Sequence, residues 1–189
     1  IWGSGATVPF GLPSMNTLNQ ILKDNIPDFD NNCDNLEIEL GKEKYNDLMP
    51  QIRNLIWNAI STVDSQVLQN LLISDGDEFI GIKKLVEKIS DAHPKVTNII
   101  TTNYDRIIEN VLSFHNIPFT DGFLGKDLSL FNENLFSSKN IVNIVKVHGS
   151  LNWFEFGGEI RYLQKSIESS VPQIICPGKN KYQEAYKSP

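Results

Sequence analysis

Apolar residues in the first half of the chain recur three or four positions apart, which is the spacing of a helix with one buried face. Over residues 45–73 they form a single long stripe, and residues 79–89 repeat the pattern over a shorter stretch. The Asp-Gly-Asp sequence at residues 75–77 separates the two predicted helices, and His93-Pro94 is expected to end the second. The pattern therefore predicts a helical lobe inserted over about residues 45–92.

The second half of the sequence alternates between β-branched runs and helical spacing. Residues 96–100 predict a buried strand, and residues 141–147 predict another strand rich in Val and Ile. Helical spacing over residues 107–112 and a short strand at residues 117–119 are expected between them. Strand, helix and strand in alternation favour a parallel sheet with crossover helices. The expected fold class is therefore α/β, a parallel sheet with flanking helices.

A hairpin signal lies in the last third of the sequence. Residues 151–156 and 159–163 flank Gly157-Gly158, a dipeptide that suits a tight β-turn. Residues 173–176 predict one further short strand. The sequence has no internal repeat and no low-complexity segment.

Composition narrows the class of protein. At 189 residues the chain suits one domain with a sizeable core. A formal net charge of −6 and a pI near 5.1 argue against a nucleic-acid-binding surface. No run approaches the ~20 apolar residues of a membrane span. No signal-peptide pattern is present either, so we expect a cytoplasmic protein without membrane contacts.

The cysteines and the two termini lead to two further expectations. Neither Cys33 nor Cys176 belongs to a C-x-x-C pair, so we expect reduced thiols, no zinc module and no metal. The sequence starts directly in a glycine turn and stops without a stop signal, so we expect a fragment of a longer protein.

Candidate chemistry begins at the glycine turn of residues 3–7, Gly-Ser-Gly-Ala-Thr, which Gly11-Leu12-Pro13 follows. The turn leads to a helix whose expected N-cap is Ser14. If it also follows a strand, its backbone N–H groups face an anion such as a dinucleotide phosphate, and glycine allows close approach and positive φ. The third glycine of the G-x-G-x-x-G fingerprint is replaced by Val8, so an ordinary glycine turn remains the alternative.

Polar residues also follow two of the predicted strands. Asn103 and Asp105 come after the strand at residues 96–100, and His148, in a His-Gly pair, comes after the strand at residues 141–147. Ligands of parallel sheets bind beyond the carboxyl ends of strands. Asn103 offers an amide for ribose hydroxyls or a water, Asp105 accepts from a carboxamide NH2, and His148 suits a general base. The structural alternatives are a helix N-cap for Asn103, a first-turn acid for Asp105 and a packing role for His148.

Together these three segments resemble the sirtuin family. In that family a Gly-Ala-Gly-x-Ser turn followed by Gly-Ile-Pro opens the fold, and Asn-x-Asp and His-Gly motifs follow. The resemblance implies a Rossmann-like fold that binds NAD, with Asn103 at the nicotinamide ribose, Asp105 on the carboxamide and His148 as the base. It makes Asn103 and His148 the expected catalytic residues. The expected NAD-binding residues are Gly3, Ser4, Gly5, Ala6, Thr7, Pro13, Asn103, Asp105 and His148.

Departures from the sirtuin pattern change the expected reaction. Ser14-Met15-Asn16 stand where the deacylases have Asp-Phe-Arg, and the zinc-binding cysteines are missing. In both respects the sequence looks like the bacterial sirtuin-like domains that cleave NAD in antiphage defence. We therefore expect an NAD glycohydrolase, an abortive-infection effector with NAD as its substrate and with nicotinamide and ADP-ribose as products.

The same resemblance bears on partners. Because constitutive NAD loss would be toxic, we expect gating by self-association or by an activating protein partner or domain. A protein deacylase and a non-catalytic sensor of NAD or ADP-ribose remain as alternatives. Retention of both Asn103 and His148 counts against the sensor.

Overall fold

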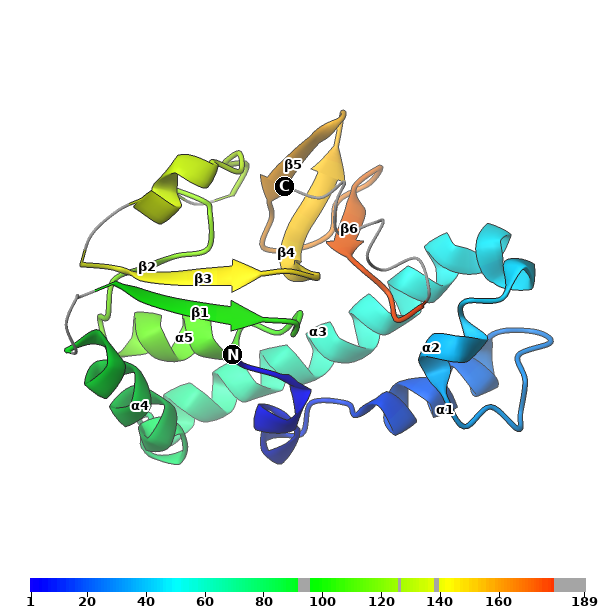
Figure 1. Cartoon of the computed structure of the whole chain (residues 1–189), viewed down its shortest axis with the longest axis horizontal. Helices are drawn as coiled ribbons and strands as arrows, with labels where there is room; N and C mark the ends of the chain where they lie inside the picture. Colours follow the sequence, from blue (N-terminus) through cyan, green and yellow to red (C-terminus); the bar gives the residue numbers. More distant parts are fainter. Residues whose placement is uncertain (92–95, 126, 138–139, 179–189) are drawn as a thin grey trace.

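A three-stranded parallel sheet forms the framework of one half of the molecule (Figure 1). The computed structural model describes residues 1–91, 96–125, 127–137 and 140–178. The strands of the sheet are β1 (Thr97–Thr101), β2 (Phe119–Thr120) and β3 (Val142–Lys146), in the order β1-β3-β2. β3 pairs with β1 along its whole length, up to the pair Thr101 and Lys146. The carboxyl ends of β1 and β3 therefore lie side by side, and the predicted parallel sheet is confirmed.

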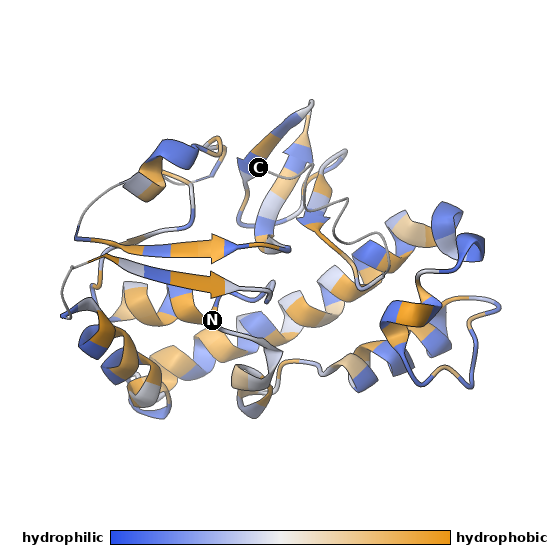
Figure 2. Cartoon of the chain, viewed as in Figure 1, coloured by the Kyte–Doolittle hydropathy of each residue, from blue (hydrophilic) through white to orange (hydrophobic). Residues whose placement is uncertain are grey.

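Three helices pack on this sheet and complete its core. They are α3 (Met49–Ile73), α4 (Ile80–Ser90) and α5 (Ile107–Phe114). In Figure 1, α4 and α5 lie on one side of β1 and β3, and α3 runs along the length of the molecule on that same side. The two helices predicted on either side of the Asp-Gly-Asp break are confirmed, whereas the predicted helix end at His93-Pro94 lies outside the described residues. Figure 2 shows the hydrophobic stripes of these helices. Fully buried apolar side chains of this core are Ile52, Ile56, Leu71, Ile107, Val111, Leu112 and Ile144.

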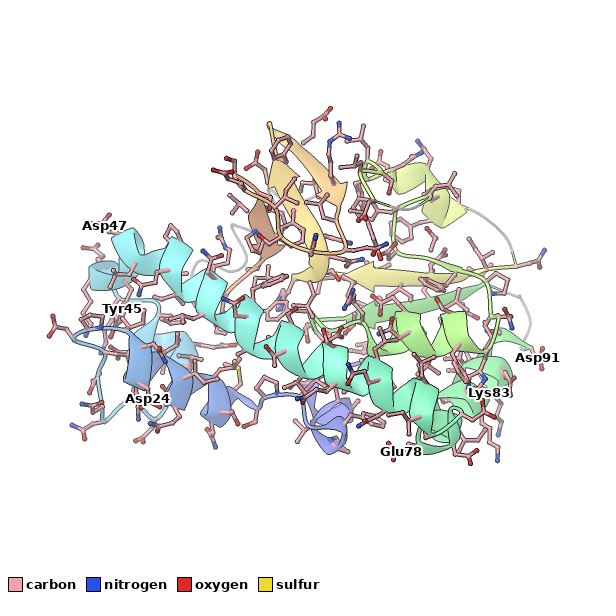
Figure 3. All side chains as sticks on the ribbon, turned by 180° about the vertical axis from the view of Figure 1, so that it is seen from behind. Asp24, Tyr45, Asp47, Glu78, Lys83 and Asp91 are labelled. Carbon is pink, nitrogen blue, oxygen red and sulfur yellow. The ribbon has the colours of Figure 1, made fainter. Side chains whose placement is uncertain are left out.

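The N-terminal segment packs against the first half of α3. α1 (Met15–Asn25) begins after Ser14, whose hydroxyl accepts a hydrogen bond from the Thr17 N–H at 3.2 Å, so the predicted N-cap is confirmed. The sequence pattern does not predict α2 (Leu36–Glu39), a single turn. Seen from behind in Figure 3, α3 crosses the molecule from the end marked by Tyr45 to the end marked by Glu78.

The described residues also include five short 3-10 helices. No helix in this part of the protein is both long and apolar enough to span a lipid bilayer. The 3-10 helices are η1 (Ser4–Ala6), η2 (Val8–Phe10), η3 (Glu43–Leu48), η4 (Asp77–Phe79) and η5 (Glu133–Ser137).

A second sheet, antiparallel and not predicted as such, follows the parallel one in sequence. Its strands are β4 (Gly149–Phe156), β5 (Glu159–Tyr162) and β6 (Val171–Ile174), in the order β5-β4-β6. The predicted hairpin is confirmed, because Gly157 and Gly158 join β4 to β5 with φ values of +65° and +84°. β6 begins two residues before its predicted position. The short link between β3 and β4 places this sheet beyond the carboxyl ends of the parallel strands (Figure 1).

The prediction that residues 96–100 form a buried strand is wrong in part, because β1 is buried only at some positions. Thr97 and Thr101 are buried, but Ile100 is 43% exposed. β1 lies at the edge of the sheet, where the N-terminal segment meets it through a parallel bridge between Trp2 and Thr101. The Trp2 N–H donates to the Ile100 C=O at 2.8 Å. This bridge brings the glycine turn, which starts at Gly3, to the carboxyl end of β1.

Candidate functional site

The loop between β1 and α5, residues 102–106, is held from three sides. From α3, the fully buried carboxylate of Asp64 accepts the backbone N–H of Arg106 at 2.7 Å and its guanidinium Nε at 2.9 Å. From the antiparallel sheet, the Leu151 N–H donates to the Tyr104 C=O at 3.0 Å. The Tyr104 hydroxyl donates to the C=O of Ile175, just after β6, at 2.5 Å. These anchors fix the direction of the side chains that the loop presents.

Asn103 connects this loop to the glycine turn. Its side chain is buried, and Nδ2 donates to the hydroxyl of Thr7 at 3.1 Å. The Thr7 hydroxyl in turn donates to the Ser4 C=O at 3.1 Å. The helix N-cap alternative for Asn103 is wrong, because α5 begins only at Ile107 and the Asn103 side chain bonds to Thr7 instead of the helix backbone. The structure therefore brings two of the three predicted segments into direct contact.

A cavity of about 220 Å³ opens at this contact. Of the predicted site residues, it brings together Ser4, Thr7, Pro13, Asn103 and Asp105. Gly3, Gly5, Ala6 and His148 are not among its lining residues. Its remaining walls are mainly apolar, from Leu12, Met15, Leu18, Ile60, Tyr104 and Pro177, with Glu37 and Thr102 as polar additions. The cavity is thus polar on the side of β1 and the glycine turn and apolar on the side of α1 and α3.

The glycine turn leaves backbone donors for a ligand. It is closed by hydrogen bonds from the Ala6 N–H to Gly3 and from the Thr7 N–H to Ser4, each at 3.0 Å. A 3-10 turn of this kind does not use its first amides, which are those of Ser4 and Gly5. An added Cβ at Gly3 or Gly5 would meet nothing within 4 Å, so the turn is open at both glycines.

The first two glycines of the turn do not use the positive φ that glycine allows. Gly3 has a φ of −120°, and Gly5 is not among the positive-φ residues either. The left-handed conformation occurs instead at Gly11, with φ +90°, where η2 ends and the backbone turns toward α1. Gly3 and Gly5 therefore provide space rather than an unusual backbone.

His148 lies at the adjacent strand end. The Val147 N–H donates to the Thr101 C=O at 3.0 Å, which keeps the ends of β3 and β1 side by side. The His148 C=O accepts the Ile175 N–H at 2.9 Å, and the residue is half-buried. His148 is therefore at the same edge of the sheet as Asn103, one strand away, although it does not line the cavity.

Asp105 has the most informative electrostatics of the site. Burial raises the pKa of its carboxyl group from 3.8 to about 6, Lys146 opposes this rise, and Glu109 adds to it. Burial, followed by the Glu109 charge, also raises the pKa of Asp121, which follows β2. We call Asp105, Glu109, Asp121 and Lys146 the charge cluster. All four are buried, and of the four only Asp105 lines the cavity.

Asp105→Asn is expected to stabilise the protein at alkaline pH. The folded state binds the Asp105 proton more tightly than the unfolded state does, since the pKa is about 6 rather than 3.8. The contribution of Asp105 to stability therefore falls as the pH rises through this interval. Asn does not ionise, so we expect D105N to raise the free energy of unfolding at pH 8 by up to about 3 kcal/mol relative to pH 4. Urea unfolding at both pH values measures this, and an equal effect of D105N at pH 4 and pH 8 would contradict it.

Sequence reasoning missed three members of the charge cluster. Asp121 directly follows β2, the same kind of position that singled out Asn103, and Glu109 lies one helical turn after Asp105. Lys146 offered the clearest signal, because a lysine within an apolar strand is almost never fully buried unless it is paired.

The described residues form no cluster of metal ligands. In that part of the protein no group of three or more His, Cys, Asp or Glu side chains is placed to hold a metal ion. Cys33 and Cys176 are both buried, unbridged thiols.

Comparison with known proteins identifies a family for the second half of the sequence. The family model of the SIR2-like domain matches residues 97–187, which begin with β1 and include Asn103, Asp105 and His148. Among curated proteins, no match was found. A sirtuin-type, NAD-related function follows from the family match. Residues 97–187 therefore match the SIR2-like family, which the residues at the strand ends had indicated.

Proposed function

We propose that this SIR2-like domain is an NAD glycohydrolase, which cleaves the nicotinamide–ribose bond and releases nicotinamide and ADP-ribose. One observation carries the proposal. The amide of Asn103, at the end of β1, bonds to Thr7 of the glycine turn in the wall of one cavity. Backbone donors for phosphate and an amide for ribose hydroxyls thereby lie close together, and NAD has both groups to offer.

The cavity suits the nicotinamide half of the dinucleotide. Its volume of about 220 Å³ is below the ~300–1,000 Å³ of sites for drug-sized ligands. In our proposal nicotinamide and its ribose occupy it, and the pyrophosphate faces the amides of Ser4 and Gly5. Asp105, in the cavity wall, accepts the carboxamide NH2, and the apolar side chains of Leu18 and Ile60 exclude water from the ring.

The reaction requires positioning and a base more than it requires an acid. The bond between ribose C1′ and the pyridinium nitrogen breaks, and its electron pair leaves with nicotinamide, which departs as a neutral molecule. The ribose passes through an oxocarbenium-like state, as in glycoside hydrolysis. A water oxygen bonds to C1′ and releases a proton. In our proposal Asn103 orients the ribose and this water, and His148, one strand away, takes the proton.

We also propose that the domain is an effector of antiphage defence, in which NAD depletion aborts the infection. The support is the resemblance to bacterial sirtuin-like domains, strengthened by the departure from the deacylase sequence at residues 14–16. Gating by self-association or by an activating protein partner or domain belongs to the same proposal, because unregulated cleavage would deplete NAD in uninfected cells.

Nicotinamide release from NAD tests the proposal, and His148→Ala is the informative variant. Removing a general base typically costs ~10²–10⁴-fold in rate, so we expect a loss of that size with NAD binding retained. His115, which ends α5 and packs on Phe114, is the matched control, since H115A removes an imidazole at the opposite end of α5 from the loop of residues 102–106. We expect H115A to turn over NAD like the wild type.

Two other results of the same assay would redirect the assignment. Nicotinamide release that requires an acylated peptide would identify a deacylase. Tight NAD binding without release by the wild type would identify a sensor.

A further inference from the structure

Lys146 is a charged residue inside the central strand of the parallel sheet. Its side chain is 0% exposed, and its ammonium donates to the backbone carbonyl oxygen of Asp105 and to Oε1 of Glu109, each at 2.5 Å. A buried ammonium is costly unless it is paired, so these two acceptors determine where it lies. Lys146 thereby ties β3 both to the loop after β1 and to α5.

The charges that face Asp105 are unbalanced. Glu109 approaches from α5, Asp64 from α3, and Lys146 from β3. The Asp64 carboxylate is engaged by Arg106 at 2.7 Å. Within the charge cluster, three carboxyl groups therefore share the single ammonium of Lys146, which is the charged group of the cluster that favours an ionised Asp105.

We propose that Lys146, paired with Glu109, is a positioning residue of the NAD site, which fixes the Asp105 loop at the cavity wall and places a positive charge near the Asp105 carboxylate that accepts the carboxamide of the dinucleotide. This inference rests on the proposed function. Folding alone does not require the pair, because replacing a buried ion pair by apolar residues is often neutral or stabilising. The direct bond from Lys146 to the backbone of a cavity-lining residue is what links it to the site.

Two substitutions change the charge around Asp105 in opposite directions. Lys146→Met removes the favourable charge, so the pKa of Asp105 rises further above about 6. Glu109→Gln removes an unfavourable charge and keeps an oxygen for Lys146, so the pKa of Asp105 falls. Because cleavage uses the carboxylate, the acid limb of kcat/KM moves to higher pH in K146M and to lower pH in E109Q, by about 1 pH unit each. If Lys146 and Glu109 had only a structural role, both variants would be less stable, but the acid limb of kcat/KM would not shift in opposite directions.

Two further variants keep the test decisive. The double variant K146M/E109L removes both charges together, so it leaves no uncompensated charge of the pair, and we expect it to fold even where K146M alone does not. It also lacks the tie to the Asp105 loop, and we expect kcat/KM to fall ~10–100-fold across the pH range. Glu39→Gln is the matched control, because Glu39 is another buried carboxylate paired with a lysine, Lys42, and does not line the cavity. We expect E39Q to keep the wild-type acid limb.

The experiment combines kcat/KM for nicotinamide release against pH with a ¹³C NMR titration of the carboxyl carbons. The Asp105 signal is assigned by its absence in D105N. We expect opposite shifts of the Asp105 titration and of the acid limb in K146M and E109Q. An Asp105 titration that stays fixed, or moves the same way in both variants, overturns the role of Lys146 whether or not the protein cleaves NAD. A different outcome combines opposite NMR shifts in K146M and E109Q with a wild type that releases no nicotinamide. That outcome contradicts the proposed function, and with it the assignment of Lys146 to an NAD site.

Discussion

Asn103→Ala is expected to lower nicotinamide release from NAD by ~10²-fold or more while the protein stays folded. The amide of Asn103 donates to Thr7 at 3.1 Å, and in our proposal it also orients the ribose and the attacking water. Alanine removes both functions from the cavity wall. The cost in stability is small, because one side-chain hydrogen bond contributes only about 1 kcal/mol net. Initial rates of nicotinamide release, with thermal unfolding measured on the same samples, give both quantities.

Asn98→Ala is the matched control for this prediction. Asn98 lies on β1, the strand that leads into the loop of Asn103, and its Oδ1 accepts a hydrogen bond from Asn143 Nδ2 at 2.9 Å. N98A therefore also replaces one asparagine and removes one side-chain hydrogen bond, but at the far end of β1 from the cavity. We expect N98A to release nicotinamide at the wild-type rate. Equal activity of N103A and the wild type would remove Asn103 from the mechanism.

Gly149→Ala is expected to cause the largest loss of stability, about 2–5 kcal/mol. Gly149 has a φ of +82°, and a Cβ there would lie 1.9 Å from the backbone oxygen of Gln173 on β6. The left-handed backbone costs a non-glycine residue about 1–2 kcal/mol, and overpacking against a fixed strand adds about 1–3 kcal/mol. Because Gly149 begins β4 directly after His148, the strand must move away from β6, and we expect activity to fall with stability. Urea unfolding measures the loss.

Gly158→Ala separates the two causes. Gly158 has a similar φ of +84°, but an added Cβ meets nothing within 4 Å. G158A therefore has the cost of the left-handed backbone alone, about 1–2 kcal/mol. If the free energy of unfolding falls no more in G149A than in G158A, the close approach of β4 to β6 at Gly149 contributes nothing to the loss of stability.

Elements with a strong local pattern are predictable from this sequence. The stripe over residues 45–73 becomes α3, and Gly157-Gly158 becomes the turn of the β4–β5 hairpin. Short strands are less well placed, because their ends depend on the partner strand rather than on their own residues. β6, for example, is defined by its pairing with β4, which is irregular between Gly149 and Phe154.

The wall of the cavity depends on contacts that no local pattern encodes. Thr7 and Asn103 are 96 residues apart in sequence. The strand-end rule predicts that their segments meet, but the atoms that touch are set by the bridge between Trp2 and Thr101. His148 obeys the same rule and lies at the same edge, yet it does not line the cavity.

The charge cluster illustrates a different limit. Charged residues are visible in a sequence, but their burial is not, and the raised pKa of Asp105 follows chiefly from burial. Lys146 stands out in the sequence as a lysine within an apolar strand, but its burial depends on the position of β3 at the centre of the sheet, between β1 and β2. Only then does its pairing with Glu109 and Asp105 become apparent.

The most direct test of the account incubates NAD with the protein, together with any activating partner or domain, and identifies the products by mass. We predict nicotinamide and ADP-ribose in equal amounts, formed at similar rates by the wild type, H115A and N98A and at least ~10²-fold more slowly by N103A and H148A. Intact NAD, recovered from the wild type under every condition that permits self-association or partner binding, would contradict the central claim.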